Sequence, residues 1–139
     1  MARTIQVLVI DGDRLNCALL RNILENEGLQ VLDASGARLG WQILRAAPCD
    51  LVITDLLITD PDGGSVLEVL LREFPETRII ALTRGGGGRS RISEREEQAF
   101  RGVVRILERP VFRQELLTAI QELFPDWQPE ESHGERHGL

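Results

Sequence analysis

The stretch LVITD at residues 51–55 carries the clearest information about the fold. An unbroken apolar run that ends in a polar residue is typical of a strand in a parallel sheet, where both faces are covered. Five short, mostly apolar runs of this kind occur along the chain, at residues 5–10, 29–32, 51–53, 79–82 and 103–107, and most of them are near-continuous. Gln30 interrupts the second run, which places it nearer an edge of the sheet.

Segments with helical spacing separate these runs. Apolar residues recur every three or four positions in four rows: Leu15, Leu19 and Ile23 with Leu20 and Leu24 beside them; Leu39, Ile43 and Ala47; Val66, Leu70 and Phe74; and Phe112, Leu116, Ile120 and Phe124. A weaker helix is expected around Ser93-x-x-Glu96, which resembles a capping box. Strands alternating with helices predict an α/β fold, an open parallel sheet with helices on both faces.

Length and composition predict one domain followed by a short tail. A chain of 139 residues suits a single domain, and 42% hydrophobic residues can form a real core. We expect the domain to span residues 1–124. Residues 125–139 are polar and are expected to form a mostly disordered tail. Residues 84–97, which include the glycines at 85–88, are expected to be the most mobile part or a tolerated surface insertion.

Several functional classes are disfavoured. The net charge of −6 argues against nucleic acid as the partner. No apolar stretch approaches the roughly 20 residues that span a bilayer, and the start of the chain lacks the pattern of a signal peptide. Cys17 and Cys49 form no CxxC motif, and we expect both to be buried in a reducing compartment. These features predict a cytoplasmic protein without a membrane partner.

Polar residues follow four of the five apolar runs at the same end: Asp11 and Asp13, Asp55, Thr83, and Arg109. Since the carboxyl ends of parallel strands share one edge, these side chains should converge where ligands gather in such sheets. A carboxylate attacks a phosphoryl group only when cations and donors offset their mutual repulsion. Clustered carboxylates also suit Mg²⁺. The pattern therefore indicates an oxyanion site.

The segments around these residues resemble the response-regulator receiver family, which is CheY-like. VLVIDGD at 7–13 resembles its first strand and acidic turn, and DLVITDL at 50–56 with DPDGG at 60–64 resembles the segment around its phosphoacceptor. IIALT at 79–83 resembles the strand that ends in its switch hydroxyl, and RPV at 109–111 resembles its lysine-proline-phenylalanine turn. The resemblance covers about residues 5–124 in register.

This resemblance implies a flavodoxin-like, doubly wound, five-stranded parallel sheet with strand order 2-1-3-4-5. It also implies a stand-alone receiver of a two-component phosphorelay, which is a signalling module and not an enzyme. In the family, a histidine kinase or phosphotransfer protein supplies the phosphoryl group with Mg²⁺ present. The face made by the fourth helix, fifth strand and fifth helix then changes its protein partners. A downstream target and a homodimer through that face are implied.

The resemblance assigns roles by position. Asp55 is the phosphoacceptor and a metal ligand, and Asp11 is an acidic residue of the metal site. The backbone carbonyl of Leu57 is a further metal ligand, and Thr83 is the switch hydroxyl. Arg109 takes the position of the family lysine.

Four positions depart from the family pattern. Gly12 replaces the usual second acid, so Mg²⁺ binding is expected to be weakened or absent unless Asp13 reaches into the site. Arg109 replaces a compact ammonium with a planar fork, which is not a conservative change at a tight site. Arg84 follows the switch hydroxyl, where a small residue is usual. Ile106 occupies the position of the aromatic switch residue, so the rotameric signal of the family is not available.

These departures leave alternatives open. Arg84 and Arg109 can replace part of the metal's role by pairing with Asp55, which would also mask the nucleophile. Alternatively, Arg84 points to solvent, and Arg109 reflects a chain in which all 16 basic residues are arginine. The domain is then either a phosphoacceptor switch or a pseudo-receiver that acts as an interaction or dimerisation module without phosphorylation. A flavodoxin-like cofactor binder is disfavoured, because the acidic turn at 11–13 would repel a phosphate group.

Overall fold

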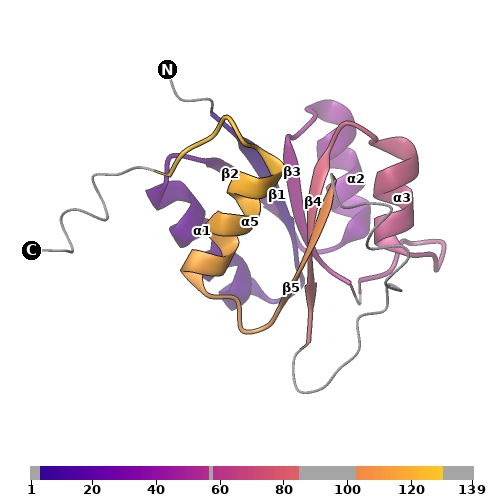
Figure 1. Cartoon of the computed structure of the whole chain (residues 1–139). Coiled ribbons are helices and arrows are strands. Elements are labelled where there is room, and N and C mark those ends of the chain that lie inside the picture. Colours follow the sequence, from indigo (N-terminus) through magenta and orange to yellow (C-terminus); the bar gives the residue numbers. More distant parts are fainter. Residues whose placement is uncertain (1–3, 57, 85–102, 130–139) are drawn as a thin grey trace, which may run out of the picture.

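A computed structural model of the chain describes residues 4–56, 58–84 and 103–129. Five strands form one parallel sheet in the order β2-β1-β3-β4-β5 (Figure 1). The strands are β1 (Gln6–Ile10), β2 (Gln30–Ala34), β3 (Leu51–Asp55), β4 (Arg78–Thr83) and β5 (Val104–Glu108). The expected strand order is confirmed, and the interrupted second run is indeed an edge strand.

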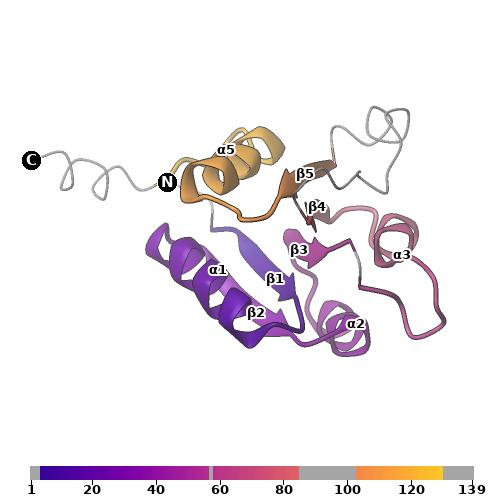
Figure 2. The ribbon, with the colours of Figure 1, turned by 90° about the horizontal axis from the view of Figure 1, so that it is seen from below.

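Helices cover both faces of the sheet. Among the described residues they are α1 (Arg14–Asn26), α2 (Ala37–Ala46), α3 (Val66–Glu73) and α5 (Arg113–Leu123). Helices α1 and α5 lie on one face, and α2 and α3 lie on the other (Figure 2). The helix expected around Ser93 and the glycines at 85–88 lie outside the described residues.

The central strands contribute alternate residues to two separate cores. Val7 and Val9 of β1 pack under α1 and α5, whereas Leu8 and Ile10 pack under α2 and α3. This alternation follows from the two-residue period of a strand. Both sets are buried, so residues 7–10 of β1 form a continuous apolar run. The sandwiched sheet gives the carboxyl ends of the strands a rigid support.

Helix α1 buries only one of its two apolar rows. Leu20 and Leu24, together with Cys17, pack against the sheet, while Leu15 is 69% and Leu19 is 55% exposed. Because both rows contain leucine, the sequence does not show which face of the helix is buried. The smaller Cys17 belongs to the row that packs against the sheet. Leu15 and Leu19 of the outer row therefore lie on the surface, while Ile23 of the same row packs partly against the core.

Helix α2 also turns a different face inward from the row that its spacing suggests. Leu39 is 42% exposed and Ala47 is exposed, while Ala37, Trp41 and Leu44 are buried. The large indole of Trp41 decides the orientation, because it stacks on Phe74 with ring centroids 5.9 Å apart. Aromatic burial of this kind outweighs a few aliphatic contacts.

Packing of the chain continues past the expected domain boundary at residue 124. Trp127 is 3% exposed and belongs to the core under α1 and α5, and its backbone N–H donates to the carbonyl of Phe124 at 2.9 Å. The folded part therefore includes the first residues assigned to the tail, and residues 130–139 lie outside the described part. None of the described helices is long and apolar enough to cross a bilayer.

Candidate functional site

The register of the sheet brings the predicted polar residues to one edge. Ile10 of β1 pairs with Thr54 of β3, so Asp11 and Asp55 are the next residues on neighbouring strands. On the other side, Thr83 of β4 pairs with Glu108 of β5, which directly precedes Arg109. Four segments far apart in the sequence thus end at the same place, as the sequence pattern predicted.

Arg109 joins the two acids of this edge. One nitrogen of its guanidinium, Nη2, donates to Asp11 Oδ2 at 2.9 Å and to Asp55 Oδ2 at 3.1 Å. The side chains of Asp11 and Asp55 are only 8% and 12% exposed, and that of Arg109 is 24% exposed. The backbone N–H of Arg109 donates to the carbonyl of Thr83 at 2.8 Å, which fixes its strand end. A single cationic nitrogen therefore bridges two partly buried carboxylates.

Asp11 accepts further hydrogen bonds from the start of α1. The backbone N–H of Asp13 donates to Asp11 Oδ1 at 2.8 Å, and the side-chain amide of Asn16 donates to Oδ2 at 2.5 Å. Burial acts to raise the pKa of Asp11. The hydrogen bonds to its ionised carboxylate and the charge of Arg109 together outweigh burial, so the pKa lies below 3.8. Asn16 is a site residue that the sequence pattern did not reveal.

Asp13 has a structural role. Its Oδ1 accepts from the backbone N–H groups of Leu15 at 3.0 Å and Asn16 at 3.2 Å, which makes it the N-cap of α1. A capping carboxylate satisfies helix N–H groups that have no partner within the helix. Asp13 is exposed and faces the helix end, so it does not substitute for the acid missing at Gly12.

The described residues supply an incomplete set of ligands for Mg²⁺. The family resemblance implies that this ion binds in an acidic pocket. Here Asp11 and Asp55 both direct an oxygen at Arg109, and Gly12 contributes no side-chain oxygen. In the described part of the chain, no group of three or more His, Cys, Asp or Glu side chains could hold a metal. The predicted carbonyl ligand, Leu57, lies outside that part.

The remaining predicted positions lie beside the site, on the surface or against the core. Thr83 is partly buried at the end of β4, beside the site. Arg84 is exposed, and the ion pairs found between described residues include none that joins it to Asp55. Ile106 is partly buried and packs against the core under α2 and α3. Of the two candidate arginines, only Arg109 contacts the acids.

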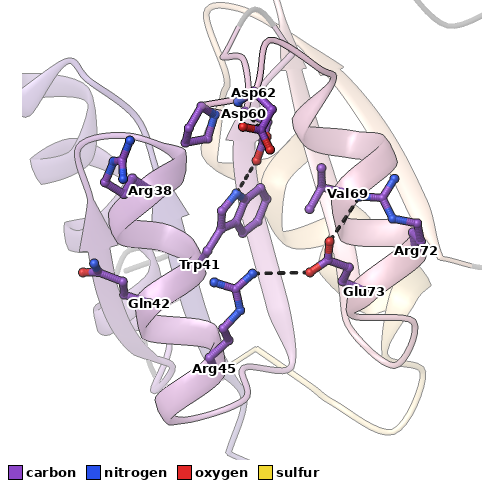
Figure 3. Close-up of a pocket in the computed structure, with 10 residues that line it drawn as sticks. Arg38, Trp41, Gln42, Arg45, Asp60, Asp62, Val69, Arg72 and Glu73 are labelled. Atoms are coloured by element: carbon purple, nitrogen blue, oxygen red, sulfur yellow. Dashed lines mark hydrogen bonds and ion pairs between the residues drawn. The ribbon is translucent and has the colours of Figure 1, made fainter.

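A concave region lies between α2 and α3, with a volume of about 310 Å³ (Figure 3). Several of the polar side chains that line it form hydrogen bonds and ion pairs with one another. The indole N–H of Trp41 donates to Asp60 Oδ1 at 2.6 Å, and Glu73 accepts from Arg45 at 3.4 Å and Arg72 at 3.1 Å. These contacts tie the two helices to the loop after β3.

The acids of that loop form its turn. The backbone N–H of Asp62 donates to Asp60 Oδ2 at 3.0 Å, and Gly63 adopts a positive φ of 88° that favours glycine. Asp60 Oδ1 is taken up by Trp41, so neither oxygen of Asp60 is directed at the acids of the sheet edge. The loop therefore has a structural role in supporting the end of β3.

Comparison with known proteins agrees with this geometry. The family model for the response regulator receiver domain matches residues 7–121. The chain therefore belongs to the response regulator receiver family, and the doubly wound fold is the one that this family shares. Receiver domains are in general signalling modules that interact with histidine kinases and downstream effectors.

Relatives and solved structures show how far the likeness extends. The transcriptional regulatory protein GlrR of Escherichia coli K12 is 28% identical over 116 residues, which is 84% of this chain and 25% of that protein. The chain thus spans about a quarter of that curated relative. A receiver domain protein from Clostridium thermocellum is 25% identical with a TM-score of 0.68, covering 90% of this chain and 95% of the other. NtrX of Brucella abortus, at 21% identity and TM-score 0.70, shares the fold; the match covers 89% of this chain and 28% of NtrX.

The amide of Asn16 is expected to hold down the pKa of Asp11. Asn16→Ala removes a donor to the ionised carboxylate, so the pKa of Asp11 should rise, which a carbon-13 NMR titration of the carboxyl carbon measures directly. Asn22→Ala, an exposed asparagine on the same helix, serves as the matched control. An Asp11 pKa that is equal in the two variants would contradict this role.

The lowered pKa of Asp11 also predicts that the stability of the fold depends on pH. The folded pKa of Asp11 lies below its usual value of 3.8. Ionised Asp11 therefore stabilises the fold above about pH 4, and this contribution is lost as the pH falls through the folded value. Asn16→Ala should lose less stability than the wild type over that acidic range, as urea unfolding at each pH would show.

Proposed function

We propose that Asp55 is the phosphoacceptor of a receiver switch. The observation that carries this proposal is the placement of its carboxylate, which lies at the carboxyl end of the central strand and in contact with a fixed cation. The side chain keeps 12% of its surface exposed, so a small phosphodonor can approach it. Adjacent positive charge reduces the repulsion between a carboxylate and a phosphoryl group.

The proposed chemistry is a direct transfer. One oxygen of Asp55 attacks the phosphorus atom, the bond from phosphorus to the donor breaks, and the leaving group departs with the electron pair. Arg109 holds Asp55 in position and stabilises negative charge on the phosphoryl oxygens. The hydroxyl of Thr83, the last residue of the neighbouring strand, would donate to one of these oxygens and thereby report phosphorylation to β4.

A protein phosphodonor would dock beside α1. Leu15 and Leu19 lie one turn apart on the exposed side of this helix, and Phe112, the residue before α5, is 64% exposed. Both α1 and α5 begin at the edge of the sheet that holds Asp55, and both lie on the same face (Figure 2). Large apolar side chains at such an edge suit an apolar helical surface of a histidine kinase or phosphotransfer protein.

The proposed output face includes β5 and α5, whereas the fourth helix lies outside the described residues. Ile106 of β5 packs against the core, and its aliphatic side chain cannot act as the family's aromatic switch residue. A signal from Thr83 would therefore pass through a shift of β4 and β5, whose strands are paired along their length. A homodimer through this face remains part of the proposal.

A pseudo-receiver is the second candidate function. The contact of Arg109 with Asp55 favours it, because an ion pair masks a nucleophile. The lack of an acid at Gly12 also favours it, since the family's cation site is then reduced. In this case the domain would act as an interaction module whose surface does not respond to phosphodonors.

Intact-protein mass spectrometry after incubation with acetyl phosphate and Mg²⁺ distinguishes the two functions. A switch should gain the mass of one phosphoryl group, and Asp55→Asn should abolish this gain. Asp62→Asn, which removes an exposed acid of the turn after β3, should leave it intact. The absence of any adduct in the wild type would favour the pseudo-receiver.

The docking surface is tested separately from the chemistry. Replacing Leu15 and Leu19 with serine should slow phosphotransfer from autophosphorylated histidine kinases by about tenfold, the effect of losing about 1.4 kcal/mol of contact. The reaction with acetyl phosphate should not change. Leu39→Ser, an exposed leucine on the opposite face, is the matched control. Equal slowing by the control would place the donor elsewhere.

A further inference from the structure

The ion-pair geometry of Arg109 indicates that the site carries its own cation. Nη2 lies 2.9 Å from Asp11 and 3.1 Å from Asp55, and both contacts run to the Oδ2 atoms. A nitrogen that bridges two carboxylates supplies positive charge directly between them. The side chains involved are between 8% and 24% exposed, so solvent screens this contact only in part.

The residues of the site also argue against a strongly bound divalent metal. A divalent cation is best held by several oxygen ligands of high negative charge. Here Gly12 provides none, and Asp13 uses its carboxylate to cap α1. Two carboxylates and one guanidinium leave a net charge of about −1 on these three side chains, half of what the two acids carry alone. They do not form the acidic pocket that a strongly bound Mg²⁺ requires.

The shape of the guanidinium adds a capability that an ammonium lacks. Its N–H groups form a rigid planar fork, and Nη2 directs its contacts at the two carboxylates. The remaining N–H groups of the fork are suited to phosphoryl oxygens, which arginine often binds in a bidentate manner. A single side chain can thus orient the nucleophile and neutralise the incoming group.

We infer that Arg109 replaces the divalent metal, so that Asp55 accepts a phosphoryl group without Mg²⁺. This inference rests on the proposed phosphoacceptor function. With acetyl phosphate, a carboxylate oxygen of Asp55 forms the new bond to phosphorus, the bond from phosphorus to the acetyl oxygen breaks, and acetate leaves with the electron pair. Charge and atoms balance without a proton or a metal.

The experiment compares adduct formation from acetyl phosphate in EDTA and in excess Mg²⁺, by intact mass. The wild type should react at rates that differ by no more than about threefold. Arg109→Gln should lose about 100-fold in the metal-free reaction, the usual cost of removing a donor to a developing oxyanion. Arg109→Lys should depend on Mg²⁺, because it keeps the charge and loses the fork. Arg72→Gln, an exposed arginine of α3, is the matched control.

Calorimetry gives a readout that does not depend on turnover. Titration of the wild type with Mg²⁺ should show no binding at low millimolar concentration, and the double variant Gly12→Asp, Arg109→Lys should gain it. An aspartate fits at position 12, since an added Cβ would lie 3.5 Å from the carbonyl oxygen of Ser35, an ordinary contact. Tight Mg²⁺ binding by the wild type would overturn the inference.

The outcomes separate the inference from the function on which it rests. An adduct that forms only with Mg²⁺ overturns the inference and leaves Asp55 as the phosphoacceptor. A metal-free adduct that survives in both Arg109→Gln and Arg109→Lys also overturns it. No adduct under any condition would reject the phosphoacceptor function itself. Circular dichroism of each variant shows whether a lost adduct merely reflects a lost fold.

Discussion

The contact between Arg109 and the acids of the sheet edge is the interaction on which the site depends. The register of β1 and β3 forces Asp11 and Asp55 to neighbouring positions, where two ionised carboxylates repel each other. Arg109 offsets this repulsion through one nitrogen, and its backbone hydrogen bond to Thr83 fixes the end of β5 beside β4. The same sheet therefore brings the two carboxylates together and positions the arginine that offsets their repulsion.

Two departures from the family pattern, Gly12 and Arg109, are consistent with each other. The missing acid at Gly12 lowers the negative charge of the pocket, and a single guanidinium then suffices to bridge what remains. Asp13, the nearest alternative acid, is committed to the start of α1. The described site is thus organised around the side chain of Arg109, and its contact with Asp55 is compatible with both proposed functions.

Much of this arrangement was predictable from the sequence, because strand runs and the polar residues after them are local features. The α/β fold and the convergence of Asp11, Asp55, Thr83 and Arg109 follow from them, whereas the strand order was implied by the family resemblance. The buried faces of α1 and α2 were not predictable, since each helix carries competing apolar rows and long-range packing decides between them. Asn16 was missed because its hydrogen bond to Asp11 depends on how the first turn of α1 lies against the end of β1. The choice between Arg84 and Arg109 likewise needed three-dimensional geometry.

A double-mutant cycle between Asp11 and Arg109 tests the central claim most directly. The free energies of unfolding of the wild type, Asp11→Asn, Arg109→Gln and the double variant, measured in urea at neutral pH, yield the coupling energy of the pair. A bridging contact of partly buried groups predicts a favourable coupling of about 1 kcal/mol or more. A coupling near zero would show that Arg109 does not hold the acids together in solution, and it would contradict the account.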